Sequence, residues 1–329
     1  MNLYRDKNSP VCGRFWFYPN WTGKRKVEGG LRTEGIYKQA GNKENSLVTI
    51  ITVCLNSSST ITQCMNSVFQ QSYRNIEYIV IDGGSTDDTI NIIEQYQDFI
   101  DYYISEPDSG LYNAMNKGIS LASGDYILIL NSDDWYVEDC VEALVKAKIY
   151  SCADFVSALA QYVDGDGNAV EIMRHMPYDD SLRLRMPLRH ETMLLSSHVY
   201  NRIGYYNEKY RILSDWDMVI RLFEAGYTLY EIPKPLLCFR NNGISQTGKS
   251  YLFSERIQLI GKLFPFLTKK ELDLFSNLAQ LTPSQLKNII EKHPKQKKFL
   301  KSLQLYINDR KNDKRQKKTS LQAWQNAKF

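Results

Sequence analysis

The sequence predicts an α/β protein with a mostly parallel central sheet flanked by helices. Patterns typical of buried strands alternate with helical patterns from residue 47 to residue 148, and the connections are short and polar. Strand, helix, strand, helix with short connections is typical of parallel layers joined by right-handed crossovers. Acidic or glycine-rich segments follow several of the strands. We therefore expect polar side chains to gather at one edge of the sheet.

Two strand and helix pairs lie between residues 47 and 96. The apolar run L-V-T-I-I-T-V-C-L is typical of a strand buried on both faces, and the hydroxyl and amide side chains after it are typical helix caps. The predicted elements are a strand from Leu47, a helix capped by Asn56 to Ser59 and running to about Gln71, a strand at Ile76–Ile81, and a helix at Thr89–Tyr96 capped by Thr86 or Asp87.

The loop D-G-G-S-T-D-D-T follows the second strand. Glycines in such a position often mark only a tight turn. However, the loop begins with Asp82 at the carboxyl end of a strand, where an acid can accept hydrogen bonds from a base or ribose. The dinucleotide pattern G-x-G-x-x-G is absent.

Residues 106 to 134 carry most of the expected chemistry. Asp108, Ser109 and Gly110 precede a helix at Leu111–Ala122, and a buried strand at Tyr126–Leu130 runs into N-S-D-D at residues 131 to 134. Such a segment can be an ordinary turn, because these residues are turn formers. Acids at the carboxyl end of a strand can also bind Mg²⁺ or Mn²⁺ that bridges to a diphosphate. We favour the metal site, since segments able to bind a ligand, at residues 108–110 and 131–134, lie before and after the same strand.

Downstream patterns continue the domain to residue 248. We expect a helix at Val137–Lys148, a strand at Phe155–Val163, a hairpin turn at Asp164–Asn168, a strand-like run at Thr192–Leu195 after Arg189, His190 and Glu191, a helix at Ile212–Phe223, and a strand at Leu236–Arg240. Asp215 and Asp217 in the last helix point about 200° apart. They therefore cannot share one role, and S-D-W-D can also act as a helix cap.

The segment Gly243–Ser250 matches the P-loop pattern G-x-x-x-x-G-K-[ST]. This match makes a nucleotide triphosphatase the rival hypothesis. Such a domain needs further parallel strands and a strand that ends in a metal-binding Asp. The remaining residues offer charged helices instead, at Tyr251–Leu267, Thr268–Ala279 and Thr282–Glu291.

Composition indicates a globular protein with a core. The chain has 329 residues, 43% of them hydrophobic, and its six cysteines are scattered, which favours buried free thiols and a reducing cytosol. No signal peptide begins the chain, and no run reaches the roughly 18 apolar residues of a membrane span. We expect a cytoplasmic protein.

The two ends differ from the middle. Residues 1–46 show no clear period, and we expect an irregular extension whose aromatic cluster, Phe15 to Trp21, packs on the main domain or on a partner subunit, so a homo-oligomer is compatible with the sequence. Between Glu291 and Lys318 eleven Lys or Arg face three acids. This basic tail, with its amphipathic piece Phe299–Ile307, is either a solvated helix or a contact with an anionic membrane. It lacks a nucleic-acid module, so we expect no nucleic-acid partner.

Five motifs in order resemble the inverting family-two glycosyltransferases of the GT-A fold. They are T-V-C-L-N, I-D-G-G-S-T-D-D-T, S-E-P-D-S-G-L-Y-N-A-M-N-K-G, L-N-S-D-D and S-D-W-D, within residues 47–248. The third is similar to a bacterial subgroup that builds exopolysaccharide and capsule. The resemblance implies a Rossmann-like GT-A domain at 47–248, between an N-terminal extension at 1–46 and a helical, basic C-terminal region at 249–329.

The resemblance also implies roles for the donor side of the site. It implies that Thr52 and Asp82 hold the base and ribose, with Asp108 and Lys117 nearby. Asp133 matches the last acid of the family's D-x-D motif and would bind Mn²⁺ or Mg²⁺.

One departure affects the metal site, because Asn131 stands where the family often has the first Asp. Its carbonyl oxygen can still contact ribose or metal, but a charge is lost.

On the acceptor side, the resemblance assigns the general base to Asp215, the first Asp of the family's E-D-x-D motif. Ser214 replaces the preceding Glu. His190 resembles a position near the diphosphate or acceptor. Trp216 could stack on the acceptor sugar or fill the core.

The implied reaction transfers a hexosyl or N-acetylhexosaminyl group from a nucleotide-diphospho sugar, with UDP favoured. The acceptor would be a hydroxyl of a glycan or lipid-linked glycan in surface polysaccharide synthesis, reached in the cytoplasm or peripherally at the inner membrane face. Asn131 and Ser214 leave room for a non-catalytic sugar-binding scaffold. A nucleotidyltransferase would need a glycine- and arginine-rich N-terminal loop, which has no counterpart here.

Overall fold

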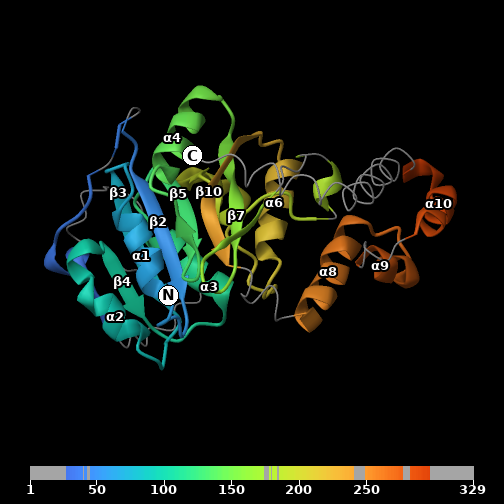
Figure 1. Ribbon diagram of the computed structural model, residues 1–329. Coiled ribbons are helices and arrows are strands. Elements are labelled where there is room, and N and C mark those ends of the chain that lie inside the picture. The colour runs from blue at the N-terminus through green and yellow to red at the C-terminus, as the bar shows by residue number, and fades with distance from the viewer. Residues whose placement is uncertain are drawn as a thin grey trace. The chain divides into compact units, whose positions relative to one another are not determined.

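The structure is a computed structural model, and it describes residues 27–39, 41–42, 45–173, 178, 180–183, 185–240, 249–276 and 282–296. The chain forms two compact units (Figure 1). The first comprises Met1–Met176 and Leu188–Tyr251, and the second comprises Pro177–Pro187 and Leu252–Phe329.

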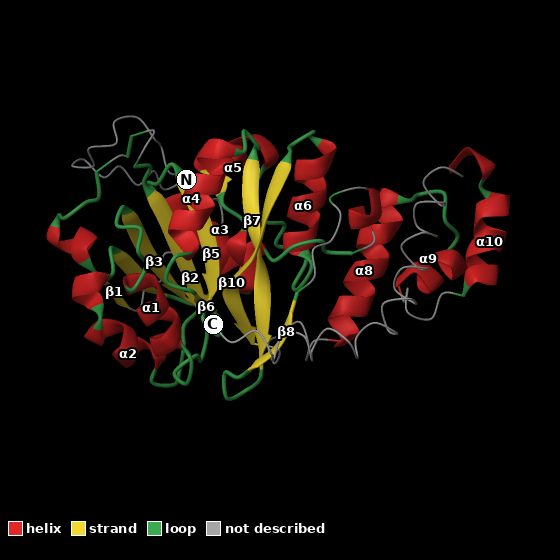
Figure 2. Cartoon of the chain, turned by 45° about the horizontal axis from the view of Figure 1, so that its top comes forward, coloured by secondary structure: helices red, strands yellow, loops and turns green. Residues whose placement is uncertain are grey.

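A six-stranded sheet organises the first unit (Figure 2). Its order is β1 (Val27–Gly29), β4 (Tyr102–Ser105), β3 (Ile76–Asp82), β2 (Val48–Cys54), β5 (Tyr126–Asn131) and β9 (Leu195–Ser196). The four inner strands pair in parallel, and the two edge strands pair antiparallel. The predicted α/β class with a mostly parallel sheet is confirmed.

Helices cover both faces of this sheet. On one face, α1 (Ile61–Phe69) and α2 (Thr89–Gln95) pack against apolar side chains that include Ile50 and Tyr78. On the other face lies α3 (Leu111–Leu121), which approaches β2 so closely that a Cβ on Gly118 would come within 2.3 Å of Ile51. Only a glycine permits this distance between helix and sheet.

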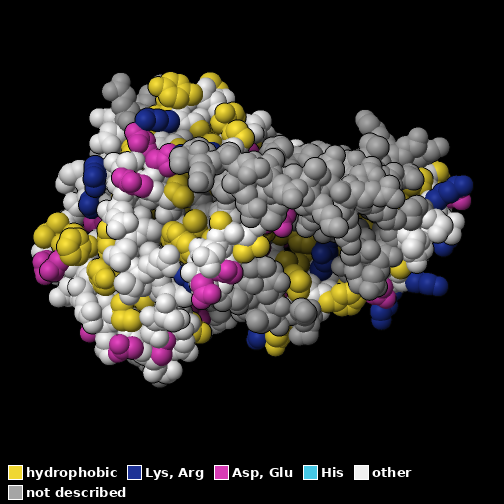
Figure 3. Space-filling view, viewed as in Figure 1, with side chains coloured by type: hydrophobic (Ala, Val, Ile, Leu, Met, Phe, Trp, Pro, Cys, Tyr) yellow, Lys and Arg dark blue, Asp and Glu magenta, His cyan; other side chains and the backbone are white. Residues whose placement is uncertain are grey.

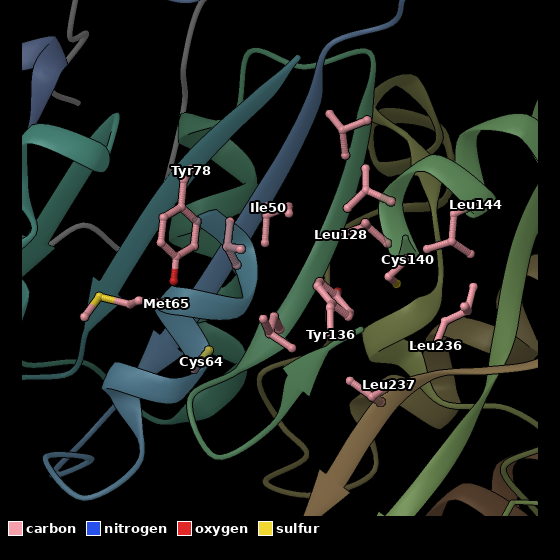
Figure 4. Packing of buried hydrophobic residues seen from close by; sticks show 14 of the residues in the cluster. Ile50, Cys64, Met65, Tyr78, Leu128, Tyr136, Cys140, Leu144, Leu236 and Leu237 are labelled. Carbon is pink, nitrogen blue, oxygen red and sulfur yellow. The ribbon is translucent and has the colours of Figure 1, made fainter. Parts of the chain in front are cut away.

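A second sheet of four strands extends the core. Its order is β6 (Trp135–Tyr136), β10 (Leu229–Arg240), β7 (Phe155–Val163) and β8 (Ala169–Ile172), and β7 and β10 run parallel. With α4 (Cys140–Tyr150) these strands continue the hydrophobic cluster that begins at β2. Figure 4 shows this continuity, from Ile50 and Leu128 through Tyr136 to Leu144 and Leu236.

Several local predictions are confirmed and two are wrong. The turn at 164–168 joins β7 and β8 as an antiparallel hairpin, as expected. The run at 192–195 is not one strand, because a 3₁₀ turn at His190–Thr192 precedes the short β9. Residues 1–46 are not wholly irregular, since β1 pairs with β4 and a 3₁₀ turn at Leu31–Glu34 follows. The structure also contains 3₁₀ turns at Gln97–Phe99, Asp180–Arg183 and Pro294–Gln296, and helices α5 (Ser197–Ile203) and α6 (Ser214–Glu224).

The second unit is helical. Helix α8 (Lys249–Leu263) leads into it, followed by α9 (Lys269–Ser276) and α10 (Pro283–Lys292). Thr282 and Gln285 form the predicted cap of α10, each side chain bonding the other's backbone N–H. Lys and Arg side chains stand out along this unit (dark blue in Figure 3). The aromatic cluster at 15–21, the loop at 243–248 and the piece at 299–307 lie outside the described residues.

Two global expectations concern cysteines and membranes. Within the described residues all cysteines are free, as predicted; Cys54, Cys64 and Cys140 are also buried as expected, whereas Cys238 is half-buried and Cys152 is exposed. None of the helices in the described part of the chain is both long and apolar enough to cross a membrane.

Candidate active site

The site lies where the strand order reverses. Strand β2 is followed in sequence by β3 and β4 on one side and by β5 on the other, and ligands of open α/β sheets bind at the carboxyl ends beside such a point. The register sets Cys54 beside Asp82 and Val53 beside Asn131. The hydroxyls of Ser57 and Ser132, 2.8 Å apart, join the loops that follow β2 and β5. The predicted polar segments therefore do share one edge.

Asp82 organises the glycine-rich loop after β3. Its carboxylate is 1% exposed and accepts hydrogen bonds from the N–H groups of Gly84, at 2.9 Å, and Ser85, at 2.8 Å. It also accepts one from the Ser105 hydroxyl on β4, at 2.7 Å. The Asp82 carboxylate thus fixes the backbone of the glycine-rich loop. A direct contact between this carboxylate and a nucleotide would require these hydrogen bonds to rearrange.

Thr52 does not reach the edge. It is fully buried, because its position in the strand directs it towards α1, and its hydroxyl accepts a 3.0 Å hydrogen bond from Tyr78. A direct contact between Thr52 and a base is therefore incompatible with this structure. The expectation for this residue needs correction.

Lys117 is also buried, beneath the loop at 106–110. Its Nζ lies 2.7 Å from Glu106 Oε1 and 3.4 Å from the Pro107 carbonyl. Lys117 therefore supports the loop that carries Asp108 and does not itself project towards a ligand. The Asp108 side chain accepts a hydrogen bond from Gly110 N at 2.8 Å and stays partly exposed. Burial raises the pKa of Asp108 above the usual carboxyl range.

The loop after β5 holds two different acids. Asp133 is partly exposed, whereas Asp134 is 1% exposed and its Oδ1 accepts a 3.0 Å hydrogen bond from Arg240 N. The Arg240 side chain in turn donates to the Asp133 carbonyl at 2.9 Å, so the end of β10 fixes this loop. Burial, and next the negative charge of Glu191, raises the pKa of both carboxyls.

Glu191 is a site residue that sequence reasoning did not single out. It is 1% exposed, and its Oε1 accepts a 3.0 Å hydrogen bond from Asn131 Nδ2. Its Oε2 lies 3.5 Å from His190 Nδ1 and has no hydrogen-bond partner in the part of the chain that the structure describes. It places a carboxylate beside the position where the D-x-D pattern has lost one. The available signal was an acid in an otherwise apolar run after Arg189 and His190.

The side-chain oxygens in the loop after β5 are the type of ligand that a hard divalent cation prefers. In the part of the chain that the structure describes, no three His, Cys, Asp or Glu side chains converge to form a metal cage. Mg²⁺ and Mn²⁺ accept oxygen donors and often need only one or two carboxylates besides phosphates and water. Asp133 offers a partly exposed carboxylate, and within the described residues the buried side-chain oxygens Asn131 Oδ1 and Asp134 Oδ2 have no hydrogen-bond partner.

Asp215 lies at the start of α6 and keeps one open side. Its side chain is 20% exposed, and its Oδ2 is 3.6 Å from His190 Nδ1. Trp216 N donates to Oδ1 at 2.7 Å, and the Tyr112 hydroxyl lies 3.2 Å from the same oxygen. Burial raises the pKa of Asp215, while nearby His190 opposes that rise. A carboxylate whose pKa is raised is a stronger proton acceptor than a free carboxylate.

The neighbours of Asp215 divide into ligand-facing and structural groups. His190 is 8% exposed, and its Nε2 has no hydrogen-bond partner among the described residues, so it can serve a ligand. Asp217 is bonded to Arg221 at 2.8 Å on another side of the helix, as the 200° separation predicted. Trp216 is 2% exposed. It fills the core, which is the second of the two roles that the sequence left open for this residue.

Comparisons with known proteins bear on this geometry. The family model described as glycosyl transferase family 2 matches residues 49 to 214. A PGL/p-HBAD biosynthesis glycosyltransferase from Mycobacterium bovis is 31% identical over 225 residues, covering 66% of this chain and 86% of the relative. The glycosyltransferase GlyA from Streptococcus pneumoniae is 34% identical over 110 residues, which are 32% of this chain and 16% of GlyA.

Solved structures share the fold. S. aureus TarS matches with a TM-score of 0.54 and 16% identity over 71% of this chain and 42% of TarS. A complex of TarS 1-349 with UDP-GlcNAc matches with a TM-score of 0.54 and 16% identity over 70% of each chain. The mannosyltransferase PcManGT from Pyrobaculum calidifontis, in complex with GDP-Man and Mn²⁺, matches with a TM-score of 0.52 and 16% identity over 83% of this chain and 88% of PcManGT.

Proposed function

The chain belongs to glycosyl transferase family 2 and is a glycosyltransferase of the GT-A fold, and from that premise we propose that it transfers a sugar from a UDP-sugar to a glycan hydroxyl with inversion. The observation that carries this proposal is the position of Asp215. It is a partly exposed carboxylate of raised pKa beside His190. Burial, and beside it the negative charge of Glu191, raises the pKa of both Asp215 and Asp133, which supports placing the two acids in one site.

The chemistry follows from these positions. Asp215 accepts the proton of the acceptor hydroxyl while the hydroxyl oxygen forms a bond to the anomeric carbon. The bond from that carbon to the diphosphate oxygen breaks, and the diphosphate leaves with the electron pair. Attack from the face opposite the leaving group inverts the anomeric centre. His190 Nε2 is free to bond the diphosphate or the acceptor.

The leaving diphosphate needs charge neutralisation. Asp133 would hold Mn²⁺ or Mg²⁺, with Asn131 and Glu191 beside it, and such an ion stabilises negative charge on departing phosphate oxygens. Glu191 supplies the carboxylate that Asn131 does not. The Mn²⁺ present with PcManGT supports this assignment.

The donor binds along the loops after β2, β3 and β4. Asp82 fixes the glycine-rich loop, and Lys117 fixes the loop of Asp108, so Asp82 and Lys117 act on the nucleotide through backbone position. Of these three side chains, only Asp108 is partly exposed. The complexes of the structural neighbours with UDP-GlcNAc and GDP-Man support a nucleotide-sugar donor, and the sequence resemblance favours UDP.

We further propose a place for the reaction. The acceptor is a glycan or lipid-linked glycan of a surface polysaccharide, reached from the cytoplasmic side. The basic C-terminal region would contact anionic lipid there. Sedimentation with liposomes that contain anionic lipid should show binding, and sedimentation that does not depend on that lipid would contradict the contact.

The decisive experiment is UDP release from a panel of UDP-sugars with Mn²⁺. Wild type should turn over at least one donor, and EDTA should abolish turnover. Asp215→Asn should lower the rate by about 10² to 10⁴-fold and still bind UDP, because general-base catalysis contributes that much. Asp133→Ala should lose metal-dependent turnover.

Asp166→Asn, in the exposed β7–β8 turn, is the matched control and should behave as wild type. UDP binding by wild type without turnover of any donor, with acceptor glycans supplied, would favour a scaffold. Full activity in Asp215→Asn would refute the assigned base. Triphosphate hydrolysis that is lost in Lys249→Ala would point to the P-loop match instead.

A further inference from the structure

Helix α3 buries an unusual row of polar side chains. Tyr112, Asn113, Asn116 and Lys117 are between 1% and 4% exposed. Polar groups in such positions must find hydrogen-bond partners, because an unmet partner costs more than an apolar side chain would. The partners of Lys117 lie in the donor loop. Those of the other three lie in the segment that leads into α6.

Asn113 and Asn116 bind that segment at residues 206 and 208. The Asn116 amide pairs with the Tyr206 backbone in both directions, donating to its carbonyl and accepting from its N–H, each at 2.9 Å. Glu208 then takes one amide hydrogen on each oxygen, from Asn116 and from Asn113, again at 2.9 Å. We call these three residues, Asn113, Asn116 and Glu208, the Glu208 clasp.

Tyr112 touches the segment where it becomes α6. Its hydroxyl donates to the Ile212 carbonyl at 2.6 Å and lies 3.2 Å from Asp215 Oδ1. A phenol has one hydrogen. The Tyr112 hydroxyl therefore donates it mainly to the nearer Ile212 carbonyl and only weakly to Asp215 Oδ1. When Asp215 takes up a proton, the hydroxyl keeps its bond to Ile212. The anchor therefore persists through proton transfer.

We propose that α3 sets the position of the base: Tyr112 is a positioning residue for Asp215, and the Glu208 clasp fixes residues 205–213, on which that carboxylate depends. The inference rests on the proposed role of Asp215. Because α3 also begins directly after Asp108 and holds Glu106 through Lys117, one helix joins the donor loop to the base. Contacts from one helix would then fix the donor loop and the segment that carries Asp215 relative to each other.

The charges around Asp215 define what Tyr112 contributes. His190 and Glu191 act on it from the 3₁₀ turn at 190–192, Tyr112 contacts it from α3, and Tyr206 lies near it in the segment before α6. Burial raises the pKa of Asp215, and the Tyr112 hydroxyl lowers it. Removing that hydroxyl should raise the pKa. The base is then protonated to a higher pH, so the acid limb of the rate profile moves to higher pH.

Tyr112→Phe and Tyr206→Phe form a matched pair. The two rings stack with centroids 5.5 Å apart, but of the two hydroxyls only that of Tyr112 lies within hydrogen-bond distance of Asp215, whereas that of Tyr206 interacts with Tyr200. Each full-length variant, labelled with ¹³C at Asp carboxyls, would be titrated by NMR, and the Asp215 signal would be the one missing from Asp215→Asn. We expect a raised pKa in Tyr112→Phe and the wild-type value in Tyr206→Phe.

Kinetics and exchange complete the test. With the donor found in the UDP-release panel, Tyr112→Phe should lower kcat about tenfold and leave the donor KM unchanged. Glu208→Gln should speed amide hydrogen exchange at residues 205–213 and lower kcat, while UDP affinity stays at the wild-type value. An Asp215 signal that titrates identically in Tyr112→Phe and wild type would overturn the role of Tyr112, and unchanged exchange in Glu208→Gln would overturn the clasp.

These outcomes are separable from the proposed function. The NMR titration reports the Tyr112–Asp215 contact whether or not Asp215 is the base. Loss of turnover in Asp215→Asn together with an unmoved titration would refute the inference alone. Retained turnover in Asp215→Asn would refute the assigned base alone.

Discussion

The Asn131 amide donates a 3.0 Å hydrogen bond to the Glu191 carboxylate, joining two side chains that are 60 residues apart in the sequence. The bond connects the last residue of β5 to the 3₁₀ turn that carries His190. Because Glu191 is 1% exposed, its negative charge adds to the effect of burial and raises the pKa of both Asp133, in the loop after β5, and Asp215, at the start of α6. The pair thus links the proposed donor side of the site to its proposed acceptor side.

The first prediction concerns this pair. Asn131→Asp replaces the donor with a second carboxylate and should destabilise the protein by about 1–3 kcal/mol at pH 7, since the bond is lost and like charges meet. Adding Glu191→Gln should restore most of this loss, because the new amide can donate in the opposite direction. Urea unfolding measures both. A double variant no more stable than the sum of its single variants would contradict the pairing.

The second prediction concerns the support of the donor loop. Lys117→Met leaves the Glu106 carboxylate, which is fully buried, without its cation and should cost about 3–5 kcal/mol of unfolding free energy. Lys117→Met with Glu106→Gln should recover part of it. Lys146→Met is the control, because the Lys146–Glu142 pair is exposed and such pairs stabilise little. Equal losses for Lys117→Met and Lys146→Met would argue against a special role for the buried pair.

The third prediction is a pH dependence. Burial raises the pKa of Asp101 from 3.8 to about 6, although Tyr78 N donates to its carboxylate at 2.7 Å. Between pH 4 and pH 6 the folded protein holds this proton more tightly than the unfolded chain does. The contribution of Asp101 to stability is therefore fully present below pH 4 and lost as the pH rises through 6, by about 3 kcal/mol in all.

Asp101→Asn isolates that contribution. Its amide oxygen can still accept from Tyr78 N, so the stability of the variant relative to wild type should rise by about 3 kcal/mol from pH 4 to pH 7. Urea unfolding at four pH values gives the difference. Asp98→Asn removes an exposed acid nearby and should track wild type. A constant difference between Asp101→Asn and wild type would show that the carboxyl is not perturbed.

The fourth prediction follows from the proposed donor role of Asp108. A Cβ on Gly83 would lie 2.5 Å from Asp108 Oδ2, so Gly83→Ala must push that carboxylate away. Only a mobile side-chain end has to move, and the free energy of unfolding should change little. Calorimetric titration with UDP and Mn²⁺ should show about tenfold weaker binding. Gly165→Ala, where a Cβ meets open space, should bind as wild type does. Unchanged binding in Gly83→Ala would exclude Asp108 from the donor site.

Local pattern was enough for most of the fold. Apolar runs predicted three of the four parallel strands, β2, β3 and β5, since strands buried on both faces need apolar side chains at every position; β4 (Tyr102–Ser105) was not predicted. Caps and turn residues predicted the starts of α10 and the β7–β8 turn. Prediction failed at residues 192–195 because a short apolar run fits a strand and a 3₁₀ turn equally well.

For the site, sequence could place residues on the right edge but not orient them. The ends of β3 and β5 carry Asp82 and Asn131 at the edge by register alone. Whether a side chain then faces ligand or core depends on neighbours far along the chain. Thr52 was expected to hold the base or ribose with Lys117 nearby, and Trp216 to stack on the acceptor or fill the core; all three side chains are buried.

The sequence by itself determined the alternation of strands and helices, the edge at which polar side chains collect, and the helix that carries Asp215. These depend on period, caps and turn chemistry, which act between residues close in the chain. The tertiary structure alone decided that Glu191 faces Asn131 and that Tyr112 reaches Asp215, contacts across 60 and 103 residues. Such contacts depend on how layers pack, because a few tenths of an ångström between helix and sheet decide which polar group finds a partner.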